Sequence, residues 1–100
     1  MKSPLPKNAY QKNAEIYKIL ANPIRLEILN ILKRGESSVE KLTKIIGIRK
    51  PNVSQHLALL RHVRLVSVSR NGQEIYYKII NPKIVEPCKI LHDLRQKNLL

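Results

Sequence analysis

The chain has 100 residues, of which 43% are hydrophobic, and this length fits one domain with a modest core. Nineteen Lys and Arg residues against seven Asp and Glu give a formal net charge of +12, which indicates nucleic acid or an anionic surface as the partner. No apolar run approaches the ~20 residues of a membrane span, and the first ten residues contain no apolar segment of a signal peptide. With one cysteine and hence no disulfide within the chain, these features predict a cytoplasmic protein without a membrane segment.

The beginning of the chain predicts a short arm and two helices. Residues 1–6 contain two prolines and are expected to form a flexible N-terminal arm, followed by a single domain over residues 7–100. Apolar residues at helical spacing predict a helix over residues 7–21, which ends before Pro23 because the residue preceding a proline avoids helical geometry. Asn22 is then a suitable N-cap for a second amphipathic helix with Pro23 in its first turn.

The sequence SSVE, residues 37–40, has the pattern of a capping box and predicts the start of a third helix. Ser37 would cap this helix, and the side chain of Glu40 would reach back to the cap residue. Gly47 is expected to end the helix, because glycine readily adopts the left-handed conformation of a helix C-terminus. The residues predicted to be buried are Val39, Leu42, Ile45 and Ile46.

The sequence KPNVSQHLALLRH predicts a fourth helix over about residues 50–63. At ~100° per residue, Val53, Leu57 and Leu60 share one side and should face the core, while His56 flanks that side and should be half-buried. The side away from the core carries Asn52, Ser54, Gln55, Ala58 and Arg61. Amide side chains can pair bidentately with adenine, and a small alanine can lie against a thymine methyl, so this side could enter a DNA major groove.

The end of the chain predicts a β-hairpin followed by a helix. Two runs of alternating apolar residues flank Asn71-Gly72, a strong signal for a two-residue hairpin turn, so a wing is predicted over about residues 65–80. A last helix is predicted over about residues 82–98, with a kink or restart at Pro87. Four helices, a hairpin and a helix, in that order, predict a mainly α (α+β) winged helix-turn-helix domain.

Basic residues are concentrated around the predicted fourth helix and hairpin. Between positions 41 and 78 there are eight basic residues and one acidic residue. Lys and Arg can neutralise phosphates and set the register on DNA, and a hairpin tip can follow the DNA backbone or enter the minor groove. The predicted contacts of this kind are Lys41, Lys44, Arg49, Lys50, Arg61, Arg70, Asn71 and Gln73. The alternative interpretation is an ordinary solvated surface.

Four segments, ILANPIRLEILNIL, SVEKLTKIIGI, KPNVSQHLALLRHVRLV and RNGQEIYYKI, resemble the arsenic-repressor (ArsR/SmtB) family of small prokaryotic repressors. The similarity covers about residues 19–81. It implies a homodimer in which the helices over residues 7–21 and 82–98 pair across a dyad, and in which one recognition helix enters each half of a palindromic operator. The interface residues it implies are Ile16, Tyr17, Ile84, Cys88 and Leu91.

The chain departs from the family pattern near the predicted DNA surface. Arg49-Lys50 stands where many members have Ser-Gln, which adds charge and removes an amide. Arg64 stands where many have Gly, so this residue is expected to be strained or differently arranged.

Family members usually release DNA when a metal or an oxidant binds. The family has three sets of metal-ligand positions. At the start of the third helix this chain has Ser37, Ser38 and Val39, and in the recognition helix it has Leu59 and Val63. At the set that involves the last helix it has Asn81, Lys83, Leu94 and Lys97. The resemblance therefore implies a repressor without the usual metal ligands, a resident cofactor or a recognisable inducer site. Cys88 and His92 share one face of the last helix, and three interpretations stay open for them: plain packing, a zinc site shared by two subunits, or an intersubunit disulfide.

The leading functional prediction is a sequence-specific transcriptional repressor that binds double-stranded DNA as a homodimer. The alternatives are a non-specific architectural DNA- or RNA-binding protein and an interaction module that has lost DNA binding. An enzyme is not predicted, because the acidic residues are scattered and the chain has neither a catalytic triad pattern nor a glycine-rich phosphate loop.

Overall fold

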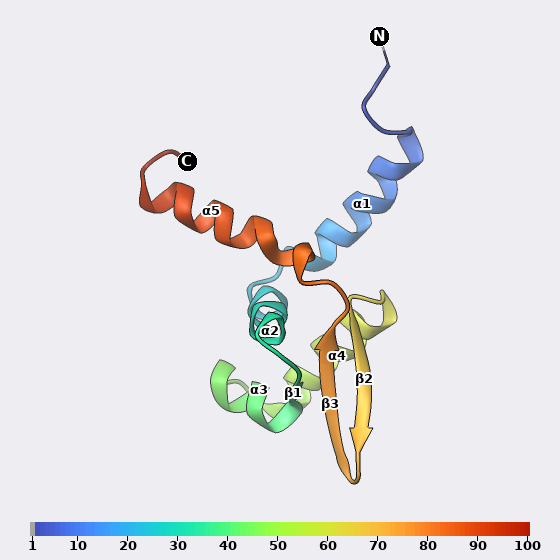
Figure 1. Ribbon diagram of the computed structural model, residues 1–100, viewed down its shortest axis with the longest axis vertical. Coiled ribbons are helices and arrows are strands. Elements are labelled where there is room, and N and C mark those ends of the chain that lie inside the picture. The colour runs from blue at the N-terminus through green and yellow to red at the C-terminus, as the bar shows by residue number, and fades with distance from the viewer. Residues whose placement is uncertain (1) are drawn as a thin grey trace.

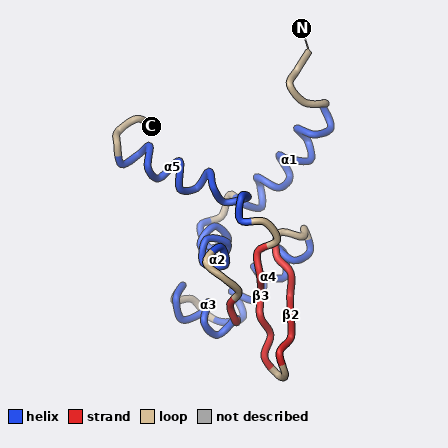
Figure 2. Tube along the Cα trace, viewed as in Figure 1, coloured by secondary structure: helices blue, strands red, loops and turns tan. Residues whose placement is uncertain are grey.

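Five α-helices, a short 3-10 helix and a three-stranded antiparallel sheet make up residues 2–100, which the computed structural model describes (Figures 1 and 2). The elements are α1 (Lys7–Leu20), α2 (Pro23–Lys33), β1 (Ser37–Ser38), α3 (Val39–Ile46), α4 (Lys50–His62), β2 (Val66–Asn71), β3 (Glu74–Ile79), η1 (Pro82–Val85) and α5 (Glu86–Gln96). Each predicted helix and the hairpin are thus confirmed, with ends that differ by one or two residues except in the last helix. Residue 1 of the predicted arm lies outside the described residues, and residues 2–6 lead directly into α1.

Local hydrogen bonds explain why the helices begin where they do. Asn22 caps α2 as predicted, because its side-chain oxygen accepts hydrogen bonds from the amides of Ile24 at 2.9 Å and Arg25 at 3.1 Å. The last predicted helix restarts: η1 gives way to α5 at Glu86, with Pro87 in the first turn, where its missing amide is not needed.

The predicted cap of α3 is wrong by one residue. The cap is Ser38, whose hydroxyl accepts a hydrogen bond from the amide of Lys41 at 3.2 Å. Ser37 is instead buried in β1, a short strand that the sequence did not predict, and Glu40 pairs with Lys50 rather than reaching back.

The predicted burial of α3 also needs a correction. Ile45 is 50% exposed, whereas Leu42 is fully buried. At ~100° per residue, Ile45 lies about 90° from the mean direction of the other three apolar residues, and therefore at the edge of the packed face.

The sheet has the order β1-β3-β2, so β3 pairs on both sides (Figure 2). Asn71 pairs with Glu74, which makes Gly72 and Gln73 the turn residues instead of the predicted Asn71 and Gly72. Gly72 has a positive φ of 67°, whereas the φ of Gln73 is not positive. In a type II′ turn only the first of the two central residues needs a positive φ, and Gly72 occupies that first position.

The core lies between α2, the inner side of α4, and the inner side of the sheet. α2 runs through the middle of the domain and contacts α1, α3, α4, β3 and η1. The buried apolar residues are Ile28, Leu29, Leu32, Leu42, Val53, Leu57, Leu60, Leu65, Val66, Ile79 and Val85.

Two helices extend away from this core. α1 and α5 diverge at one end of the long axis, and the hairpin tip lies at the other end (Figure 1). Of the described residues in α1 and α5, none is fully buried. The radius of gyration is 15.5 Å, compared with about 13 Å for a compact chain of this length. Within residues 2–100, no helix is long and apolar enough to cross a membrane.

Candidate nucleic-acid interface

Helix α4 has one buried side and one exposed side. Val53, Leu57 and Leu60 are 0% exposed and anchor the helix in the core, as the sequence predicted. The opposite side is solvent-exposed at Asn52, Gln55, Ala58 and Arg61, and half-buried at Ser54. The polar side chains that were predicted to read bases are therefore free to contact a ligand.

The connection between α3 and α4 determines the orientation of the exposed side of α4. Gly47 ends α3 in the left-handed conformation, with φ 80°, and Pro51 lies in the first turn of α4. A side chain at Gly47 would be strained at this φ, so the short link depends on the glycine. At the other end of α4, Arg64 has φ 63°, which confirms the expected strain.

The predicted basic contacts are all exposed and lie on α3, on α4 and its N-terminal link, and on the hairpin. They are Lys41 and Lys44 on α3, Arg49, Lys50 and Arg61 at α4, and Arg70, beside Asn71 and Gln73 at the hairpin tip. Because these side chains are exposed, their cationic groups are accessible to a polyanion. Among the remaining residues of the hairpin, the Tyr76 hydroxyl donates a hydrogen bond to Glu74, and this bond raises the pKa of Tyr76.

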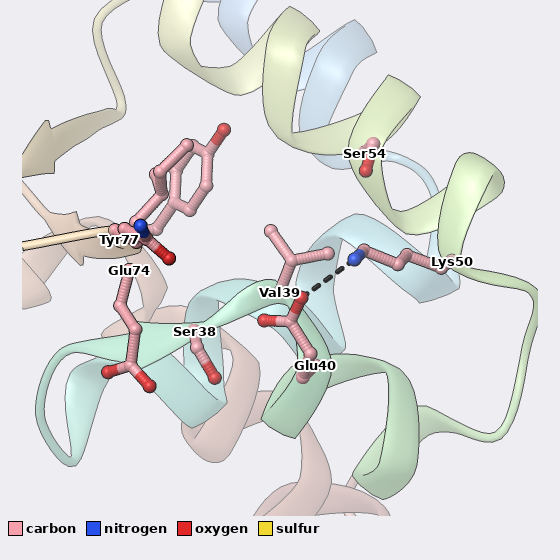
Figure 3. A pocket seen from close by; sticks show the side chains of 9 residues that line it. Ser38, Val39, Glu40, Lys50, Ser54, Glu74 and Tyr77 are labelled. Carbon is pink, nitrogen blue, oxygen red and sulfur yellow. Dashed lines mark hydrogen bonds and ion pairs between the residues drawn. The ribbon is translucent and has the colours of Figure 1, made fainter. Parts of the chain in front are cut away.

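Lys50 differs from the other cations because it has an acidic partner. Its Nζ lies 2.7 Å from Oε1 of Glu40, so that the start of α4 is joined to the start of α3 (Figure 3). The hydrogen bond from Lys50 lowers the pKa of Glu40. This pair borders a cavity of about 460 Å³ between α3, α4 and β3, which Ser54 and Tyr77 also line. The contact spans ten positions in the chain, and no local sequence pattern indicated it.

His56 lies at the edge of the buried side of α4 and is half-buried, as predicted. Its Nδ1 accepts a hydrogen bond from Nε of Arg25 at 3.2 Å. Burial, with the charge of Arg25 as a second cause, lowers the pKa of His56. Arg25 was not predicted to have a functional role, because the contact joins residues 31 positions apart.

The residues predicted for the dimer interface come together between α1 and α5. Tyr17, Ile84, Cys88 and Leu91 line one cavity of about 320 Å³, and Ile16 lines a neighbouring cavity beside Tyr17. Tyr17 is 65% exposed and Leu91 45% exposed. This apolar, solvent-accessible groove is called the α1–α5 groove below.

Cys88 is a free, half-buried thiol on this groove, and His92 on the same helix is exposed. Within the described part of the chain, no group of three or more His, Cys, Asp or Glu residues is arranged to hold a metal ion.

A capped helix, a short link, a second helix with an exposed polar side, and an antiparallel hairpin define a winged helix-turn-helix protein. The model of the family "Bacterial regulatory protein, arsR family" matches residues 22–68. The transcriptional repressor PagR of Bacillus anthracis is 35% identical over 85% of this chain and 86% of PagR. The chain therefore belongs to the ArsR family of transcriptional regulators, which are not enzymes, and the resemblance noted in the sequence is confirmed.

Two further comparisons agree with this assignment. The HTH-type transcriptional regulator KmtR of Mycobacterium tuberculosis is 38% identical over 81% of this chain, and the chain spans 62% of the length of KmtR. The homodimeric winged helix-turn-helix DNA-binding domain of Mb0332 from Mycobacterium bovis, a possible ArsR-family transcriptional regulator, superposes with a TM-score of 0.78. It is 27% identical, and the match covers 98% of this chain and 95% of that domain.

Proposed function

We propose that this protein is a transcriptional repressor that binds a palindromic operator as a homodimer and thereby excludes RNA polymerase. The observation that carries the proposal is the division of α4, in which the apolar side is 0% exposed at Val53, Leu57 and Leu60 while the polar side is open. A helix whose outer side is largely exposed to solvent and surrounded by cations has the form that the major groove accepts.

In this proposal the residues on the outer side of α4 divide into two roles. Asn52, Ser54 and Gln55 donate and accept hydrogen bonds at base edges, and Ala58 packs against a base methyl group. The basic residues on α3, α4 and the hairpin bind phosphates, together with Asn71 and Gln73 at the wing tip. Phosphate contacts release condensed counterions, so affinity is expected to fall steeply as salt increases.

The α1–α5 groove is the proposed dimer interface. Its exposed apolar side chains, such as Tyr17 and Leu91, would be removed from water by the same groove of a second copy. An isologous interface of this kind places two α4 helices about a dyad, as a palindromic site requires. The homodimeric state of the Mb0332 domain supports this arrangement.

No resident metal enters the proposal. At one set of family ligand positions this chain has Asn81, Lys83, Leu94 and Lys97, and ammonium groups do not fit a site for a cation. The other two sets have serine, valine and leucine, which supply no thiolate or imidazole. The proposed mechanism is steric exclusion of RNA polymerase by the bound dimer.

Selection from a random-sequence duplex pool tests the proposal. The full chain is expected to enrich a palindromic sequence, called the selected duplex below, and to bind it at least 1,000-fold more tightly than random DNA at physiological salt, in the usual range for specific regulators. Failure to enrich any sequence, with equal affinity for all duplexes, would instead establish the alternative, a non-specific architectural binder.

A further inference from the structure

We propose that Arg25 is a positioning residue for DNA binding: it holds α4 against the end of α1 through the ring of His56, and protonation of that ring releases the hold. This inference rests on the proposed function, because it concerns how the reading helix is oriented. It assigns a role to two residues that lie outside the predicted DNA contacts.

One side chain joins three helices at this point. Nε of Arg25 donates a hydrogen bond to Nδ1 of His56 at 3.2 Å, and Nη1 of Arg25 donates one to the carbonyl oxygen of Ile19 at 3.1 Å. The backbone amide of Arg25 is itself fixed by the cap residue Asn22. The last turn of α1, the first turn of α2 and the middle of α4 are therefore connected through one guanidinium group.

Arginine is suited to this position because its donors are fixed in one plane. The carbonyl of Ile19 belongs to the last turn of α1, where helix carbonyls lack a partner within the helix. The guanidinium satisfies this carbonyl with one nitrogen and reaches His56 with another. A lysine carries all its donors on one nitrogen and cannot place separate nitrogens beside His56 and the carbonyl of Ile19, as Arg25 does.

The contact with His56 requires a neutral ring. An imidazole that accepts at Nδ1 carries its proton on Nε2, and protonation turns Nδ1 into a donor. A second donor facing the Arg25 guanidinium would break the hydrogen bond and bring two cations together. Among the charged groups of residues 2–100, Arg25 is the one whose charge shifts the pKa of His56, in the same direction as burial. The neutral form is thus favoured at neutral pH.

The location of the contact connects the proposed dimer interface to the proposed reading surface. Ile19 lies two residues after Tyr17 of the α1–α5 groove, and His56 follows Gln55 on α4. In a dimer on a palindrome, the two α4 helices must match the spacing of the half-sites. Without the contact to α1, the distance between the two α4 helices of the dimer would vary. Affinity for the selected duplex would therefore fall more than affinity for random DNA.

Binding of the 100-residue chain to the selected duplex, measured by fluorescence anisotropy at constant ionic strength, tests the role of the contact between Arg25 and His56. Between about pH 7.5 and pH 5.0, a range extended below the usual titration range of histidine because the pKa of His56 is lowered, wild-type affinity is expected to fall about tenfold. His56→Asn places a non-titrating acceptor near the position of Nδ1, and its affinity should change less than about threefold over the same range. His62→Asn is the matched control, because this histidine is exposed on the same helix and should leave the wild-type profile intact.

A titration of the free protein by NMR provides a readout that does not depend on DNA. The pKa of His56 is expected to lie below its usual value in wild type and to rise in Arg25→Met, which keeps the aliphatic stem and removes the charge. Arg25→Met should also bind the selected duplex more weakly and with a flatter pH profile.

The possible failures are distinguishable. An enriched duplex whose wild-type affinity does not change with pH, or His56→Asn with the full wild-type pH dependence, overturns the role of Arg25 and leaves the repressor proposal in place. A pKa of His56 that is equal in wild type and Arg25→Met overturns the pairing itself. Failure to enrich any duplex removes both proposals.

Discussion

Helix α4 and the α1–α5 pair are both amphipathic, yet their apolar sides have different environments. On α4, Val53, Leu57 and Leu60 are 0% exposed because α2, α3 and β2 of the same chain cover them. On the α1–α5 pair, Tyr17 is 65% and Leu91 45% exposed. One apolar side is completed within the subunit, and the other retains surface that a second subunit would bury.

This difference separates two kinds of stability in one small chain. Burying a large apolar side chain contributes roughly 1.5 to 3 kcal/mol, so the core under α4 should hold the subunit together at any protein concentration. The α1–α5 groove should contribute its share only upon association, and its contribution should therefore depend on concentration. Variants on the two surfaces can test this distinction, beginning with the largest expected effect.

Leu57→Ala should lower the free energy of unfolding by about 2 to 5 kcal/mol, because it leaves a cavity under α4. Urea denaturation followed by circular dichroism measures the change, and its size should be similar at low and high protein concentration. A loss under 1 kcal/mol would show that α4 is not anchored in a tightly packed core.

Leu91→Glu should convert the dimer to a folded monomer, because it places a charge in the α1–α5 groove. Analytical ultracentrifugation measures the association, and affinity for the selected duplex should fall about 100-fold or more as the second half-site is lost. Ile45→Glu, at a residue on α3 with a similar exposed fraction, is the control and should remain dimeric. A Leu91→Glu dimer with unchanged association would place the interface elsewhere.

Gln55→Ala and Lys50→Ala should separate reading from phosphate binding on the outer side of α4. Loss of the Gln55 amide should reduce discrimination between the selected and random duplexes by about 1 to 3 kcal/mol. Lys50→Ala should weaken binding to both duplexes and lower the slope of log affinity against log salt by about one. Competition titrations at several salt concentrations measure both effects; identical behaviour of the two variants would remove the distinction.

The smallest expected effect is at the end of α4. Arg64→Gly should raise the free energy of unfolding by about 0.5 kcal/mol, because glycine adopts the observed φ of 63° without strain while increasing the freedom of the unfolded chain. Arg61→Gly, three residues earlier and inside the helix, should have the opposite sign and cost about 1 kcal/mol. Thermal denaturation of both variants compares them, and destabilisation by Arg64→Gly would contradict the strain.

The sequence was sufficient for features that depend on local chemistry. The division of α4 followed from helical spacing, and the cap at Asn22 and the restart at Pro87 followed from side-chain and backbone hydrogen bonding. Each of these features is determined within one or two turns of chain, which is the range over which a residue pattern carries information.

Features that depend on long-range pairing were missed or misplaced. β1 exists because Ser37 and Ser38 pair with Tyr77 and Tyr76 of β3, and two serines have no strong strand preference of their own. The cap of α3 moved by one residue because this pairing buries Ser37, whose hydroxyl donates to the carbonyl of Ser38, and leaves the Ser38 hydroxyl to accept from the amide of Lys41.

In the candidate site too, features set by local sequence were predicted and contacts between distant residues were not. The exposed polar side of α4 was predicted, but the ion pair of Glu40 with Lys50 and the contact of Arg25 with His56 were not. Both contacts connect different helices, and their formation depends on how those helices pack. No pattern within either helix indicates its partner.

NMR titration of isotope-labelled protein with the selected duplex tests most directly whether the exposed side of α4 lies on DNA bases. The side-chain amides of Asn52 and Gln55 and the backbone amides of the outer side of α4 should shift most, together with the hairpin tip around Gln73. The α1–α5 groove should be unaffected. The largest shifts on α1 and α5, with α4 unchanged, would contradict the assignment of α4 as the reading helix.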